Sequence, residues 1–106
     1  MRYLLNSATI STPGTYRYRL LTVEEARRWL AAGGWVSRIG YPATARYIRR
    51  LWGLEVPLSR APSPMAAGDE ALVVRLKYRL EDAGLKQAHW EPAAEDWEIG
   101  LLVRLA

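Results

Sequence analysis

Residues 71–80 constrain the fold of this chain more than any other part of the sequence. Apolar side chains fill one of the two alternating sets of positions: Leu72, Val74, Leu76, Tyr78 and Leu80. An alternation with a period of two is typical of a strand whose two faces meet different surroundings. Residues 97–105 alternate in the same way and close the chain. The sequence therefore predicts a sheet that includes both stretches.

Three more strands and two helices are expected in the rest of the chain. The strands are predicted at residues 3–5 and 15–21, and residues 55–60 are expected to form a short strand or an extended segment. The first helix begins with a capping box, in which Thr22 and Glu25 satisfy each other's backbone donors, and it ends at the glycine pair 33–34. Its apolar stripe is Val23, Ala26 and Leu30.

The second helix is expected over residues 42–52. Pro42 suits the first turn, where a missing N–H costs nothing, and Gly53 suits the end. Its apolar stripe is predicted to be Ala45, Ile48 and Trp52.

These elements predict one α/β (α+β) domain over residues 1–106, with a sheet of about five strands flanked by helices. Five tryptophans and six tyrosines are many for a core of this size. Aromatic residues are enriched where subunits meet. A homodimer is therefore expected.

Composition excludes several kinds of chemistry. The chain has no cysteine and one histidine, His89, which lies in a predicted connection without a carboxylate pair nearby. The acidic residues between positions 91 and 98 are interpreted as a solvated face, so neither a metal nor a cofactor is predicted. No apolar run approaches about 18 residues and no leader segment is recognised. We expect a cytoplasmic protein without a membrane partner.

The cations are unusual in kind. The net charge is +4, and all but two of the 15 cations are arginine. Guanidinium groups pair with phosphate in a two-pronged geometry that ammonium groups lack. Codon bias or a thermophilic source would give the same composition, so the placement of the arginines must decide.

Three segments are candidates for binding an anion. Arg75, Lys77 and Arg79 share one face of the predicted strand 71–80, about 7 Å apart, and an ordinary solvated face is the alternative. Residues 40–44 open the second helix, where free N–H groups attract phosphates, or form a plain junction. Residues 6–11 are mostly small and polar and follow a predicted strand. Such a segment is typical of a ligand site at a strand end, and an ordinary turn is the alternative.

The order of these segments resembles a known family. Leu5-Asn6 with small polar residues is followed by Ile39-Gly40-x-x-x-Thr44, by Arg60 in an extended segment, and by Tyr78-Arg79-Leu80-Glu81-Asp82-x-Gly84. The chain is similar in this to the viral ring nucleases, the type III anti-CRISPR family. The similarity extends over nearly the whole chain.

The resemblance implies a homodimer with a mixed sheet that binds cyclic tetra-adenylate across the dimer interface. It also implies cleavage without metal, in which a ribose 2′-hydroxyl attacks the adjacent phosphate. The products would be linear di-adenylates with a 2′,3′-cyclic phosphate. In a virus-infected host, this would occur in the host cytoplasm and dampen type III CRISPR immunity.

The resemblance also implies roles for individual residues. Asn6, Thr9 and Ser11 correspond to the polar binding segment of the family. Thr44 corresponds to its helix-start hydroxyl, and Arg60 to a ligand-binding arginine.

Further roles fall on the long strand and the turn after it. Arg79 corresponds to the arginine at the end of that strand, and Asp82 stands where the family has a glutamate near the scissile phosphate. Arg75 replaces an uncharged polar residue, which would strengthen the attraction for phosphate.

Tyr41 departs from the family pattern. The family has a histidine here that protonates the leaving 5′-oxygen. A tyrosine hydroxyl has a reference pKa of about 10, against about 6.5 for histidine, and is the weaker acid. General acid catalysis contributes about 10²- to 10⁴-fold, so we expect slow cleavage.

Two other functions remain open. The chain could sequester cyclic oligoadenylate without cleaving it, because the acid position is changed. It could also be a small basic nucleic-acid-binding protein, although no recognition helix for duplex DNA or RNA is evident.

Overall fold

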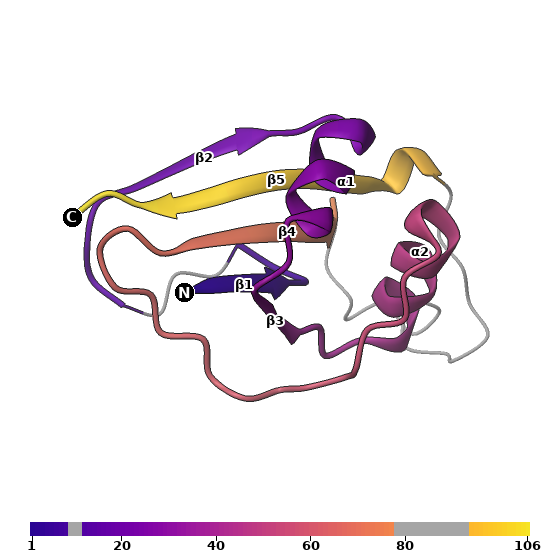
Figure 1. The fold of residues 1–106 in the computed structure, drawn as a ribbon, viewed down its shortest axis with the longest axis horizontal. Helices are drawn as coiled ribbons and strands as arrows, with labels where there is room; N and C mark the ends of the chain where they lie inside the picture. The colour runs from indigo at the N-terminus through magenta and orange to yellow at the C-terminus, as the bar shows by residue number, and fades with distance from the viewer. Residues whose placement is uncertain (9–11, 78–93) are drawn as a thin grey trace.

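The described part of the chain forms one five-stranded mixed sheet with two α-helices (Figure 1). A computed structural model describes residues 1–8, 12–77 and 94–106. Its elements are β1 (Arg2–Leu5), β2 (Tyr16–Leu20), α1 (Val23–Ala31), β3 (Trp35–Arg38), α2 (Pro42–Trp52), β4 (Glu70–Leu76), the 3₁₀ helix η2 (Ala94–Asp96) and β5 (Trp97–Arg104). The predicted α+β class and the number of strands are confirmed.

The strand order is β2-β5-β4-β1-β3. β1 pairs in parallel with both β3 and β4, whereas β5 is antiparallel to β4 and to β2. Four strands therefore run in one direction, and β5 alone among the described strands runs against them (Figure 1). The ends of β1, β2, β3 and β4 meet on one side, which we call the carboxyl edge.

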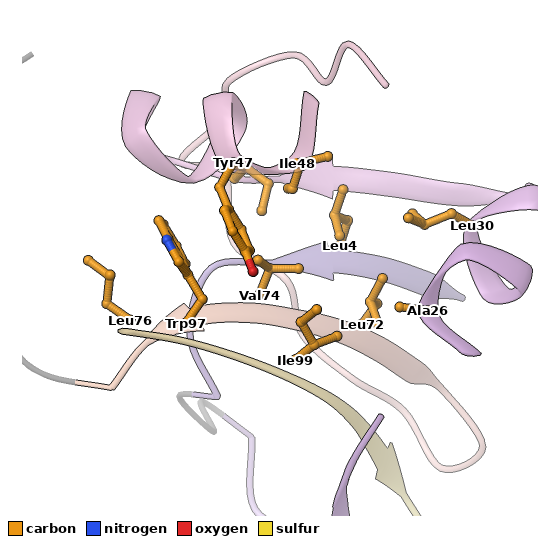
Figure 2. Close-up of a cluster of buried hydrophobic side chains, with 11 residues drawn as sticks. Leu4, Ala26, Leu30, Tyr47, Ile48, Leu72, Val74, Leu76, Trp97 and Ile99 are labelled. Atoms are coloured by element: carbon orange, nitrogen blue, oxygen red, sulfur yellow. The ribbon is translucent and has the colours of Figure 1, made fainter. Parts of the chain in front are cut away.

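Both helices pack on the same face of the sheet (Figure 2). Ala26 and Leu30 of α1 and Ile48 of α2 are buried there against strand residues. On this face, Tyr47 stacks on Trp97 with ring centroids 4.4 Å apart. The strand residues of this cluster include Leu4, Leu72, Val74, Leu76 and Ile99. The alternation predicted for β4 is confirmed on this face.

Two details of the helix stripes differ from the prediction. Val23, the first residue of α1, is 45% exposed. In α2 the buried residues are Thr44, Tyr47 and Ile48. The predicted Ala45 and Trp52 are only partly buried at the margin of the cluster.

The opposite face of the sheet has its own buried cluster. Tyr3, Leu5, Ala71, Val73 and Leu102 form it. Met65, from the segment before β4, covers part of this face, and the Tyr3 hydroxyl donates to the Pro64 carbonyl oxygen at 3.0 Å. The face of β4 that carries Ala71 and Val73 is therefore apolar at its start, and further along it Arg75 is partly buried and Lys77 is exposed.

The strand alternative for residues 55–60 is wrong. This segment forms no strand ladder: it meets the sheet through an isolated bridge between Ile39 and Leu58 and through a hydrogen bond from the Ser37 hydroxyl to the Pro57 carbonyl oxygen. Pro57 lies within it and has no N–H for a ladder. The fifth strand of the sheet is instead β3, which pairs with β1. It follows Gly33 and Gly34, where the chain turns with positive φ. The strand predicted at 71–80 is confirmed only from 71 to 76, because residues 78–80 lie outside the described residues.

We predict that Gly100→Ala destabilises the fold through Tyr18. The Tyr18 ring lies across Gly100, and a Cβ there would stand 2.3 Å from Tyr18 Cζ. Relieving the overlap requires Tyr18 to move and lose its hydrogen bond to Glu98. Chemical denaturation should show a loss of about 1–3 kcal/mol in the free energy of unfolding.

A double-mutant cycle provides the control for this substitution. In a Tyr18→Ala background the ring is absent, so Gly100→Ala should cost much less. An equal cost in both backgrounds would contradict the proposed overlap.

Candidate functional site

A hollow of about 300 Å³ opens at the carboxyl edge of the sheet. Three segments line it: Asn6 and Ser7 after β1, Arg38 and residues 40–41 after β3, and residues 59–63. Leu5 stands opposite Arg38 in the β1–β3 ladder, so the sheet register brings the first two segments together.

Asn6 ties the end of β1 to the start of α2. Its side-chain Oδ1 accepts a hydrogen bond from the Gly40 N–H at 2.7 Å. A backbone N–H can only donate, so this contact fixes which end of the amide faces Gly40. The Nδ2 end of Asn6 is thereby left to donate elsewhere.

Arg60 lies over the loop that precedes α2. Its Nε donates to the Gly40 carbonyl oxygen at 3.3 Å, and its guanidinium carbon lies 5.3 Å from the centre of the Tyr41 ring. A Cβ at position 40 would stand 3.1 Å from Arg60 Cγ. Gly40 thus permits the close approach of Arg60.

Tyr41 is the N-cap residue of α2, with extended backbone angles. Its side chain makes no capping hydrogen bond, and it is 37% exposed at the hollow. The Tyr41 side chain is accordingly accessible to a ligand in the hollow.

Arg38 also lines the hollow, although the sequence did not predict it as a site residue. Its Nε donates to the Pro62 carbonyl oxygen at 3.3 Å and its Nη1 to the Ser37 carbonyl oxygen at 3.0 Å. Arg38 ends a parallel strand, and side chains at such ends often form ligand sites. The position of Arg38 at a strand end could have predicted this role only if β3 had been predicted as a strand.

The hollow is positively charged. Its described lining includes two arginines and no carboxylate. Within the described ranges, neither Arg38 nor Arg60 forms an ion pair with a carboxylate. Over the same residues, no group of three or more histidines, cysteines, aspartates or glutamates is placed to hold a metal ion. The arrangement suits an anion.

Among the described residues, the predicted site residues Thr44 and Arg75 do not line this hollow. Thr44 is in the first turn of α2 but is 2% exposed. Arg75 pairs with Glu98 on β5, with Nε and Oε2 2.7 Å apart. A carboxylate therefore offsets the charge that we expected to attract phosphate. Thr9, Ser11, Arg79 and Asp82 lie outside the described residues.

Tyr18 completes the cluster around Glu98. Its hydroxyl donates to Glu98 Oε2 at 3.0 Å. Burial and this contact raise the pKa of Tyr18. Burial alone would raise the pKa of Glu98, but the hydrogen bonds from Arg75 and Tyr18 outweigh it and hold that pKa below its ordinary value.

Fold and hollow together define a small α+β protein with one mixed sheet and a basic recess at its carboxyl edge. The STIV B116-like family model matches residues 2–90, and the chain belongs to that family. Its fold is that of B116 of Sulfolobus turreted icosahedral virus, with a TM-score of 0.73 at 20% identity over 97% of this chain and 98% of that one.

Relatives occur in a virus and in a bacterium. The chain is 35% identical over 86 residues to protein 26 of Sulfolobus islandicus filamentous virus, covering 77% of this chain and 73% of the relative. It is 30% identical over 104 residues to YddF of Bacillus subtilis, covering 95% and 94%. No helix among the described residues is long and apolar enough to cross a membrane.

We predict that Glu98→Gln reduces the loss of unfolding free energy that occurs as the pH is lowered. Folding lowers the pKa of Glu98, so the ionised carboxylate stabilises the fold at pH values above its ordinary pKa of 4.5. This stabilisation is lost as the pH falls through the lowered pKa of the folded protein. Since Arg75 is 38% exposed, solvent screening limits the effect to about 1 kcal/mol. The free energy of unfolding at pH 7 and pH 4 tests this.

Glu55→Gln is the matched control, because Glu55 pairs with Arg49 at a site where both side chains are largely exposed. It should leave the pH dependence close to that of the unaltered protein. A Glu98→Gln profile parallel to that of the unaltered protein would exclude the assigned role.

Proposed function

We propose that this chain binds cyclic tetra-adenylate across a homodimer interface and lowers its free concentration. Cleavage without metal, at a slow rate, is the favoured route. In a virus-infected cell this would dampen type III CRISPR immunity, and the relatives found in archaeal viruses support that setting.

One observation carries the proposal. Asn6, Tyr41 and Arg60, to which the resemblance gives roles, all line the same hollow. They come from separate segments: Asn6 is 34 residues from Gly40, and Arg60 is 20 residues from it. Long-range folding brings them together, which turn chemistry within a single segment would not require.

The electrostatics of the hollow fit a cyclic tetranucleotide. Such a ring carries four phosphates, and in a two-fold dimer each residue occurs twice. Arg38 and Arg60 would then present four guanidinium groups. Charge stabilisation of the phosphate in the transition state is often the largest single contribution to catalysis.

In the proposed reaction the ribose 2′-oxygen forms a bond to phosphorus and the bond to the 5′-oxygen breaks. The 2′-hydroxyl gives up its proton, and the leaving 5′-oxygen gains one. Tyr41, at the exposed start of α2, is the residue assigned to donate that proton. Arg79 and Asp82 keep the roles that the resemblance implies.

Sequestration is the second candidate. It is favoured by the tyrosine at the acid position, because tyrosine is a weaker acid than histidine. A chain that binds the ring tightly but transfers the proton poorly would act stoichiometrically.

The test is incubation with labelled cyclic tetra-adenylate without metal, at several ratios of protein to ligand. More than one ligand cleaved per dimer identifies an enzyme, and a mobility shift with intact ligand identifies a sequestering protein. If neither occurs and long nucleic acid binds with a steep salt dependence, the protein is a nucleic-acid binder.

We predict that Arg60→Ala weakens binding of the ring about tenfold or more, because a charge-assisted hydrogen bond contributes about 1.5–3 kcal/mol. Arg17→Ala is the control, since Arg17 is exposed on β2 at the opposite edge of the sheet from β3. Equal affinities of the two variants would remove Arg60 from the site.

We predict that Tyr41→His raises the single-turnover cleavage rate while affinity changes little. Histidine is the better acid near neutral pH. An unchanged rate would show that proton donation from this position does not limit cleavage.

A further inference from the structure

We propose that Arg38 is a phosphate-binding residue and that it forms one phosphate subsite with Arg60 inside the hollow. The resemblance assigns no role to Arg38. The subsite follows from the geometry. Only the identity of the phosphate-containing ligand, cyclic tetra-adenylate, rests on the proposed function.

Four acceptor atoms of the hollow take part in hydrogen bonds within the protein. Asn6 Oδ1 accepts from Gly40 N–H, and the Gly40 carbonyl oxygen accepts from Arg60 Nε. The Pro62 carbonyl oxygen accepts from Arg38 Nε. Ser59 Oγ accepts from the Ala61 N–H at 3.3 Å.

The same walls present several donors. They are the Asn6 amide N–H groups, the Ser59 hydroxyl hydrogen and guanidinium N–H groups of Arg38 and Arg60. A ligand group that complements these donors has several acceptors. Phosphate oxygens meet that requirement, and guanidinium groups bind them with short, charge-assisted bonds.

Arg38 is held in place by neutral partners. Two backbone carbonyls accept from it, and its guanidinium carbon lies 5.9 Å from the centre of the Tyr3 ring. Carbonyls and a ring orient the side chain but bring no negative charge. Within the described residues, no carboxylate pairs with this half-buried side chain.

Three other arginines differ in this respect, whereas Arg104 also donates to backbone carbonyl oxygens, those of Met65 and Ala106, away from the hollow. Arg2 pairs with Glu70, Arg49 with Glu55, and Arg75 with Glu98. Their carboxylate partners account for their positions. For Arg38 and Arg60 the corresponding counter-charge would come from the ligand.

The first experiment uses inorganic phosphate as the probe. Phosphate is titrated into isotope-labelled protein at constant ionic strength, and amide and arginine Nε resonances are followed. We expect saturable shifts at Gly40, Ser59 and the Nε groups of Arg38 and Arg60. Arg38→Gln should abolish this saturation, and Arg17→Gln, on the far edge of the sheet, should preserve it.

The second experiment measures affinity for cyclic tetra-adenylate. Arg38→Gln should weaken binding about tenfold or more and flatten its salt dependence. Arg38→Lys keeps the positive charge but lacks the two-pronged guanidinium geometry, so its affinity should lie between those of the unaltered protein and Arg38→Gln. Asn6→Asp retains an acceptor for Gly40 N–H but replaces a donor by a charged acceptor, so it should also weaken binding.

The outcomes separate this inference from the proposed function. If Arg38→Gln binds both probes like the unaltered protein, the subsite is refuted even where cyclic tetra-adenylate binds. If cyclic tetra-adenylate fails to bind but phosphate saturates the hollow through Arg38, the subsite stands and the proposed function falls. Arg38-dependent binding of single-stranded RNA would then identify a nucleic-acid backbone as the carrier.

Discussion

β1 is hydrogen-bonded on both sides to strands that run in its own direction. Parallel neighbours cannot be joined by short hairpins, so the chain must leave the sheet and return between them. It does so here through α1 and α2, which bury Ala26, Leu30 and Ile48 on one face (Figures 1 and 2). The same constraint places Asn6 and Arg38 side by side, because parallel strands end together.

Local signals sufficed for much of this architecture. The capping box of Thr22 and Glu25 is present with both of its hydrogen bonds. Gly53 ends α2 in the left-handed conformation, as its position after the helix predicted. Alternation also located β4 and β5, although β4 is buried on both faces over residues 71–74. These features depend on neighbours in sequence, which is why they could be predicted.

Non-local features escaped prediction. β3 has four residues, and its strand character comes from pairing with β1, more than 30 positions away. Without β3, nothing in the sequence marked Arg38 as the end of a parallel strand. The ion pair between Arg75 and Glu98 likewise forms only through the register of β4 with β5. By contrast, the predicted residues Asn6, Tyr41 and Arg60 do share one hollow.

The internal hydrogen bonds of the hollow also bear on conformational entropy. An arginine free in solvent loses about 0.5–1.5 kcal/mol of rotamer freedom when a ligand immobilises it. Arg38 and Arg60 are already fastened to the carbonyls of Pro62 and Gly40. Much of that ordering therefore accompanies folding, and a ligand entering the hollow meets walls that are preorganised.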